Sequence, residues 1–263
     1  MIGSPRGTDG ALLTVDRGMQ VLRAFRGDRA ALSNAELVRR TGLPKATVSR
    51  LTSTLLQIGF LRHRSGGREF ELATGPIGIG HAFEASSDLL QAAGPHLQRL
   101  ADTLNVSVAL AVEDRLEMLY VGYRVGPQVA TLRMGVGSVL SLASTSIGHA
   151  YLWGLPPSQR QGLIDALRDR AGTQGDVVEA GIRRSFAELE AGGVCGVLGG
   201  HTAGAYGIAL PVWLGRERAP MGLSCGKAGL RPDLAAERRR IAPALKQAAR
   251  DLEVALAGID ARH

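Results

Sequence analysis

The sequence predicts an α+β protein in which an N-terminal winged helix-turn-helix precedes a larger mixed domain. Residues 12–75 read as helix, helix, turn, helix and basic hairpin, which is the order of elements in a winged helix-turn-helix. From residue 95 onward, short apolar segments with strand character are mixed with helical segments, as in α+β domains. The basic charge of the chain is concentrated at its N-terminal end.

The composition is that of a folded protein without a membrane segment. The 263 residues are 45% hydrophobic and 21% charged, which permits a packed core and argues against global disorder. No apolar run approaches the ~18 residues that a membrane span needs. The first ten residues lack the apolar region of a signal peptide, so we interpret residues 1–11 as a flexible tail. Two cysteines, Cys195 and Cys225, make no disulfide framework, and we expect a reduced cytoplasmic protein.

The net charge of +7 is unevenly distributed along the chain. Residues 1–75 hold twelve Lys and Arg against six Asp and Glu, a net charge of +6, whereas the rest of the chain carries a net charge of +1. A basic end of this kind indicates contact with a polyanion. A basic surface that serves only solubility is the alternative, although solubility would not require the asymmetry.

Residues 12–75 carry the start and stop signals of each element. Apolar residues recur at helical spacing over 14–25. Ser33 followed by Glu36 matches a capping box, in which Ser33 accepts from the Glu36 amide and Glu36 reaches back. Gly42 marks the turn, and Pro44 suits the first position of a third helix that runs to about Ile58. Basic residues 63–68 then join two segments with strand character, which predicts a wing.

The third helix has an apolar stripe made of Val48, Leu51, Leu55 and Ile58, so its opposite face is small and polar with Arg50 at the centre. A helix that enters the major groove of DNA must be lean enough to approach the bases, and an arginine there can bridge guanine O6 and N7. A helix-turn-helix that contacts only protein is the alternative. The candidate DNA contacts on this helix, the first helix and the wing are Arg17, Lys45, Ala46, Thr47, Ser49, Arg50, Ser53, Arg64 and Arg68.

The pair Gly75-Pro76 predicts the end of this first domain. Helical character over residues 76–94, up to Gly94-Pro95, predicts a linker helix before a mixed domain over 95–263. The glycine-rich residues 192–207 are interpreted as turns or a pocket lid, and residues 232–259 as a long terminal helix. Further strands are predicted at 106–112, 116–123, 129–134, 205–214 and 221–225, and further helices at 95–103, 146–153, 156–168 and 179–192.

Several motifs resemble the IclR family of bacterial regulators. The N-terminal ones are TVDRG (14–18), LVRRTGLPKATVSRL (37–51) and QIGFL (57–61), and the C-terminal ones are VGS (136–138), LASTSIGHA (142–150) and MGLSCG (221–226). The similarity covers about residues 12–258. It implies a winged helix-turn-helix, a linker helix and a GAF-like effector-binding domain. It also implies a homodimer, often paired as a tetramer, that binds a partly palindromic double-stranded DNA operator in the bacterial nucleoid and represses or activates catabolic and stress operons.

The resemblance also implies a small-molecule effector pocket. Positions matched to the family place Ser146, Ile147, Gly207, Leu223 and Cys225 in it. This sequence lacks an acidic cluster of many relatives at residues 197–201, and has Gly207 for a common Cys and Leu223 for a Ser. We therefore expect a bulkier, less polar ligand, such as an aromatic acid. Alternation along the last strand would put Leu223 and Cys225 on one face, and free amides at the helix start near Ser146 favour a carboxylate.

Other chemistry finds less support in the sequence. His149, His201, Cys195 and Cys225 lack the close paired spacing of a structural zinc site, and no metal, cofactor or catalytic residue is predicted. A Cys225–His201 nucleophile pair stays open. One alternative is therefore an enzyme of the hydrolase type that keeps a helix-turn-helix as an accessory and uses Cys225 or a serine. The other is a constitutive DNA-binding protein, without an effector, whose C-terminal domain only oligomerises.

Overall fold

The computed structural model describes residues 10–26, 31–129, 134–228 and 232–260. The chain divides into two compact units, residues 1–83 and 84–263, and the division falls inside a helix. The predicted flexible tail lies outside the described residues except for Gly10 and Ala11, which begin the first helix. Within the described ranges, no helix is both long enough and apolar enough to cross a membrane.

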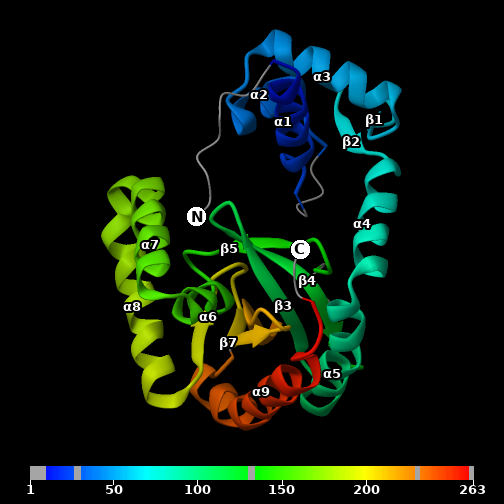
Figure 1. The fold of residues 1–263 in the computed structure, drawn as a ribbon. Coiled ribbons are helices and arrows are strands. Elements are labelled where there is room, and N and C mark those ends of the chain that lie inside the picture. The colour runs from blue at the N-terminus through cyan, green and yellow to red at the C-terminus, as the bar shows by residue number, and fades with distance from the viewer. Residues whose placement is uncertain (1–9, 27–30, 130–133, 229–231, 261–263) are drawn as a thin grey trace. The chain divides into compact units, whose positions relative to one another are not determined.

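The N-terminal unit is a winged helix-turn-helix, as the sequence predicts (Figure 1). Its helices are α1 (Gly10–Arg23), α2 (Asn34–Thr41) and α3 (Lys45–Gln57), and the antiparallel strands β1 (Leu61–His63) and β2 (Phe70–Leu72) form the wing. A bridge between Leu32 and Phe70, which the sequence did not indicate, ties the segment before α2 to the wing. Every element contributes to one apolar core, which includes Val21, Leu32, Leu37, Val48, Leu55, Leu61 and Phe70.

Local signals set the boundaries of the helix-turn-helix. The Ser33 hydroxyl accepts a hydrogen bond from the Glu36 amide (3.2 Å) and so begins α2. The Glu36 carboxylate does not reach back as a capping box requires, because it binds Arg39 and Arg40 instead (2.6 and 2.7 Å). Gly42 ends α2 in the left-handed conformation (φ 69°), which glycine adopts without a steric cost. Pro44 is the N-cap of α3, one position before the predicted one.

The linker region differs from the prediction. Instead of one helix over residues 76–94, two helices meet at Ser87: α4 (Gly75–Ser86) and α5 (Asp88–Leu104). The Ser87 hydroxyl accepts from the Leu90 amide (3.4 Å) and begins α5. Pro95, which was expected to open a new helix, lies inside α5. A proline in a helix interior costs about 3 kcal/mol, and the burial of a whole apolar face of α5 in the core offsets this cost.

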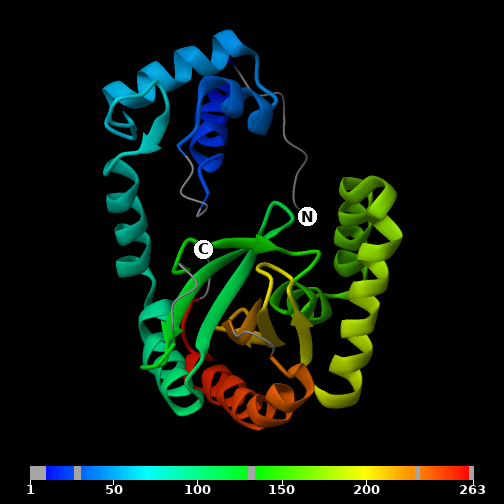
Figure 2. The same ribbon diagram turned by 180° about the vertical axis from the view of Figure 1, so that it is seen from behind.

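An antiparallel sheet of six strands forms the centre of the C-terminal unit (Figures 1 and 2), in the order β5-β4-β3-β8-β7-β6. Strand β6 belongs to the stretch that was interpreted as turns or a lid, so that interpretation was wrong for its residues. The predicted strand at 129–134 falls mostly outside the described residues. The strands are β3 (Ser107–Asp114), β4 (Glu117–Val125), β5 (Val139–Ser141), β6 (Cys195–Leu198), β7 (Ala205–Leu214) and β8 (Ala219–Ala228).

Helices cover both faces of this sheet. Helices α5 and α9 (Leu234–Leu256) pack on one face, against side chains that include Leu223 and Cys225 of β8. Helix α6 (Ser146–Gly154) packs on the other face, while α8 (Gly175–Gly192) packs against α6 and the edge strand β6, and α7 (Pro157–Ala171) packs against α8. Ala109 and Ala209 belong to the apolar core on this side. Because side chains alternate along a strand, neighbouring residues of β8 belong to different layers. The layered arrangement confirms the predicted α+β class.

Candidate nucleic-acid interface and ligand cavity

The outer face of α3 is small, polar and exposed. Val48, Thr52 and Leu55 are the buried residues of the helix. Ile58, predicted to continue this stripe, is 58% exposed, because α3 ends at Gln57 and Ile58 is its C-cap. The predicted contacts on the outer side of α3 and on the wing are exposed: Lys45, Ala46, Ser49, Arg50, Ser53, Arg64 and Arg68. Thr47 and, on α1, Arg17 are half-buried.

The arginine side chains of the N-terminal unit differ in their hydrogen-bond and ion-pair partners. In the part of the chain that the structure describes, no hydrogen bond or ion pair engages the Arg50 guanidinium. On the wing, Arg64 pairs with Glu69 (3.2 Å) and Arg62 pairs with Glu71 (3.0 Å). Exposed ion pairs of this kind contribute about 0–1 kcal/mol, so Arg62 and Arg64 stay available to a phosphate. Arg62 was missed in the sequence, although its place next to the buried Leu61 in a short strand puts it on the outer face.

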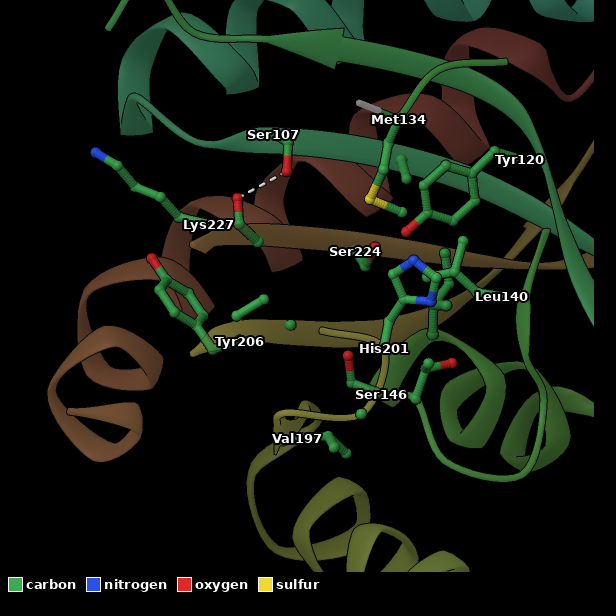
Figure 3. Close-up of a pocket in the computed structure, with 17 residues that line it drawn as sticks. Ser107, Tyr120, Met134, Leu140, Ser146, Val197, His201, Tyr206, Ser224 and Lys227 are labelled. Atoms are coloured by element: carbon green, nitrogen blue, oxygen red, sulfur yellow. Dashed lines mark hydrogen bonds between the residues drawn. The ribbon is translucent and has the colours of Figure 1, made fainter. Parts of the chain in front are cut away.

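A cavity of about 70 Å³ lies on the side of the sheet that α6 covers (Figure 3). Residues of β3, β4, β7 and β8 form its floor, and the loops before α6 and after β6 contribute to its walls. One ordered water needs about 10–15 Å³ of such space. The cavity therefore suits a small molecule.

The N-terminus of α6 forms one end of the cavity. Thr145 caps the helix: its hydroxyl accepts from the Gly148 amide (3.3 Å) and donates to the Ser141 carbonyl (2.6 Å). The next two residues, Ser146 and Ile147, line the cavity as the sequence predicted. Their amides come first in the helix and have no acceptor within it. Free amides at the positive end of a helix dipole favour an anion such as a carboxylate.

Gly207 also lines the cavity, as predicted, and it allows α6 to lie close to the sheet. A Cβ atom at this position would be 2.5 Å from Ser146 Oγ. On the neighbouring strand, a Cβ atom on Gly222 would be 2.6 Å from Ile147 Cγ1. The missing side chains therefore admit the first turn of α6, rather than leaving space for a bulkier ligand.

The rest of the lining combines hydroxyls with apolar groups. Burial raises the pKa of Tyr120, and the nearby Ser224 side chain opposes this effect. Met134 and Leu140 supply apolar surface near the Tyr120 ring (Figure 3). Lys227 stands well apart from Ser146 in the same view. No Asp or Glu occurs among the described residues of the lining.

Two of the five predicted effector residues, Leu223 and Cys225, do not line the cavity. The alternation argument puts them on one face of β8, but that face packs against α5 and α9. Ser224 and Gly226, which point to the opposite face, line the cavity instead. The prediction failed because both faces of the sheet are covered, so an apolar pattern does not indicate which face holds the cavity. Ser224 is the one residue of β8 with a hydroxyl group, and it could have indicated which side of the strand faces the cavity.

The thiols and imidazoles do not assemble into a reactive centre. Cys225 faces α5 and α9 whereas His201 lines the cavity, so the Cys225–His201 pair is not formed. Burial raises the pKa of the Cys195 thiol to about 12 and also raises that of Cys225, which keeps both protonated. Over the described ranges, no group of three or more His, Cys, Asp or Glu could hold a metal ion. The enzymatic alternative is therefore not favoured.

A buried polar network lies beside the first turn of α6. His149 is 3% exposed, with Nε2 2.9 Å from the Ala143 carbonyl oxygen and Nδ1 2.7 Å from Ser185 Oγ. A carbonyl oxygen only accepts, so Nε2 carries the proton and Nδ1 accepts from the Ser185 hydroxyl. Burial lowers the pKa of His149, and the Ala143 hydrogen bond and the Glu188 charge oppose this effect.

A winged helix-turn-helix joined to an α+β domain with an internal cavity defines a class of two-domain regulators. The sequence matches the family model of the IclR helix-turn-helix domain over residues 14–65 and that of the bacterial transcriptional regulator IclR C-terminal domain over residues 81–254. The chain therefore belongs to the IclR family of bacterial transcriptional regulators.

Individual relatives agree with this assignment. The HTH-type transcriptional regulator TsaQ1/TsaQ2 of Comamonas testosteroni is 31% identical over 183 residues, which are 69% of this chain and 66% of that protein. Matches to curated relatives span 48–66% of their lengths. A crystal structure of an IclR family regulator from Brucella abortus is 29% identical, with a TM-score of 0.82, and the match covers 97% of this chain and 96% of that one.

The fold is also shared with an IclR homologue from Microbacterium hydrocarbonoxydans, whose structure is a complex with 4-hydroxybenzoate. It is 22% identical, with a TM-score of 0.64, and the match covers 92% of this chain and 98% of that one. At this identity the likeness concerns the fold alone.

The lowered pKa of His149 predicts how stability depends on pH. In the unfolded chain the imidazole of His149 becomes protonated near pH 6.5, whereas in the folded chain its pKa is lower. The stabilisation is therefore complete above about pH 6.5 and is lost as the pH falls toward the folded pKa. Between about pH 7.5 and 5.5 the wild type should lose up to about 1.4 kcal/mol more than His149→Gln, measured by urea unfolding of the full chain. Identical pH profiles for the two proteins would contradict the assignment.

Proposed function

We propose that this chain is a sequence-specific DNA-binding transcription regulator whose affinity for its operator is controlled by a small organic acid. The observation that carries the proposal is the outer face of α3, a lean polar surface with an unpaired Arg50 guanidinium among the described residues. The major groove of B-DNA is about 12 Å wide and admits one such helix. The net charge of +6 over residues 1–75 supplies attraction to phosphates.

In this proposal the residues of the unit have different roles. Arg50 bridges guanine O6 and N7 while small neighbours, such as Ala46 and Ser49, let the helix approach the bases. Lys45 at the start of α3 contacts a phosphate. The wing arginines contact the flanking backbone or minor groove, and phosphates replace the wing carboxylates as their partners. These contacts position the protein, whereas Arg50 reads the sequence.

Arg50→Ala should weaken binding to a duplex that the purified protein selects from a random pool. The loss of one bidentate base contact is worth about 1–3 kcal/mol, or about 5- to 150-fold in affinity. Fluorescence anisotropy at one fixed salt concentration measures it. Arg183→Ala, which removes an equal charge at an exposed position of α8, is the matched control and should bind as the wild type does. Wild-type affinity in Arg50→Ala would remove this residue from sequence reading.

We also infer that the protein binds a partly palindromic site as a homodimer, and that dimers pair into tetramers. Helix α4 has no buried residue within this chain, and Ile77 and Ile79 are 68% and 62% exposed. An apolar helix face that stays exposed in the described part of the chain is stabilised by burial against another surface. A second copy of α4 supplies a self-complementary surface of this kind.

A dimer predicts two protected half-sites on the selected DNA, about 34 Å or a multiple of that apart, in a hydroxyl-radical footprint. The double substitution Ile77→Asn/Ile79→Asn should shift the mass in light scattering toward the monomer. Val177→Asn, at a site of similar exposure on α8 (66%), is the control and should leave the mass unchanged. A wild-type monomer on a single half-site would overturn the inference.

The proposed effector is an organic acid with one ring or less. Its carboxylate binds at the Ser146 and Ile147 amides, and its apolar part lies against Tyr120, Met134 and Leu140. The expectation of a less polar ligand rested partly on Leu223, which does not line the cavity, whereas Ser224 adds a hydroxyl there. The 4-hydroxybenzoate of the Microbacterium hydrocarbonoxydans homologue is an acid of this class, but the ligand class proposed here rests on the cavity's own lining.

Benzoate should bind the full chain at least about tenfold more tightly than benzamide in isothermal titration calorimetry, since a neutral amide gains little from the helix terminus.

Ser146→Pro removes one of the two free amides at a position where proline suits a helix, and extended Thr145 (ψ 150°) tolerates it. It should weaken benzoate about 10- to 100-fold. Ser146→Ala, which keeps the amide, is the control. Equal binding of benzamide would contradict an acid site, and no binding of either would favour the constitutive alternative.

A further inference from the structure

Three buried polar side chains from three elements meet next to the first turn of α6. They are His149 of α6, Ser185 of α8 and Cys195 of β6, and each is less than 5% exposed. None of the three lines the cavity. Burying polar groups is unfavourable unless each has a partner, so their presence in an otherwise apolar layer calls for a reason.

The hydrogen bonds of this cluster end on two carbonyl oxygens that flank the acid-binding amides. His149 Nε2 donates to the Ala143 carbonyl (2.9 Å), which lies in the loop that leads into α6. Cys195 Sγ donates to the Ser146 carbonyl (3.4 Å), in the first residue of the helix. The Ser185 hydroxyl donates to His149 Nδ1 (2.7 Å), and Ser185 also lies beside Cys195. Together these hydrogen bonds hold the peptide groups on both sides of Thr145.

The loop itself has little freedom to compensate for a lost bond. The Gly148 Cα lies so close to the backbone of Leu142 that a Cβ there would collide with it. The Ser144 hydroxyl donates to the Gly200 carbonyl (2.9 Å), which belongs to the loop after β6. The direction of the first free amides depends on how this short loop is fixed against α6. The side chains of Thr145 and His149 both connect the helix to the loop.

We propose that His149 is a positioning residue for the ligand, which holds the loop before α6 so that the amides of Ser146 and Ile147 converge on a carboxylate. The inference rests on the proposed function, because it assigns this end of the cavity to an acid. His149 acts through Ala143 and touches no ligand. A neutral imidazole fits the role, since it donates from one nitrogen and accepts at the other.

The test compares two substitutions at this position in the full chain. His149→Gln keeps one donor and one acceptor, whereas His149→Leu keeps a similar volume and neither group. His149→Leu should weaken benzoate at least about tenfold, and His149→Gln should stay within about threefold of the wild type. Ile182→Ala, in the same apolar layer, controls for lost stability, because it should lower the thermal midpoint without changing benzoate affinity. Wild-type affinity in His149→Leu would overturn the proposal.

A second measurement needs no ligand. In Ser185→Ala, which keeps the imidazole but removes its partner, the hydrogen-bonded amides of Gly148 and His149 at the start of α6 should exchange hydrogen faster, while those in the middle of α8 stay protected. Unchanged exchange at both amides would overturn the positioning role even if His149→Leu does not fold. If the wild type binds no benzoate but hydrogen exchange in Ser185→Ala rises as expected, the proposed acid site is wrong, whereas the role of His149 in fixing the loop before α6 is supported.

Discussion

The close approach of α6 to the sheet is the constraint on which the C-terminal unit depends. A side chain on Gly207 or Gly222 would collide with the first turn of this helix, and one on Gly148 would collide with the loop before it. Because these positions are glycines, the N-terminus of α6 lies directly over β7 and β8. Its unpaired amides, the hydroxyl of Ser224 and the ring of Tyr120 thereby come to line one small cavity. In the proposed function, the preference for an anion follows from the backbone, and no positive side chain is needed at that end.

The N-terminal unit could be predicted from sequence because its signals are local. Ser33, Gly42 and the apolar spacing in α3 each act within one or two turns of the chain, and the structure confirms the elements that they indicate. The errors there concern single residues at the ends of helices. Ile58 followed the helical spacing but lies beyond the last turn of α3, where periodicity no longer determines burial.

The C-terminal errors arise where distant contacts decide the outcome. Gly94-Pro95 has the local character of a helix end, but the burial of α5 against β4 and α9 keeps the helix intact through Pro95. The phase of β8 was predicted correctly, since Leu223 and Cys225 share a face. Which layer that face meets depends on how helices from residues 88–104, 146–192 and 234–256 distribute over the sheet. No pattern within the strand carries that information, apart from the single hydroxyl of Ser224.

Hydrogen bonds also connect the wall of the cavity to α5, the helix that follows the linker helix α4. Tyr206 lines the cavity, and its hydroxyl donates to Glu237 of α9 (2.7 Å). Arg240 binds the same carboxylate (2.6 Å) and donates to the carbonyl of Leu104 (2.8 Å), the last residue of α5. Although burial raises the pKa of Glu237, its bonds to Tyr206 and Arg240 lower it overall, so the carboxylate remains charged. A ligand that displaces Tyr206 must therefore either break one of these hydrogen bonds or shift the last turn of α5 together with the Tyr206 side chain.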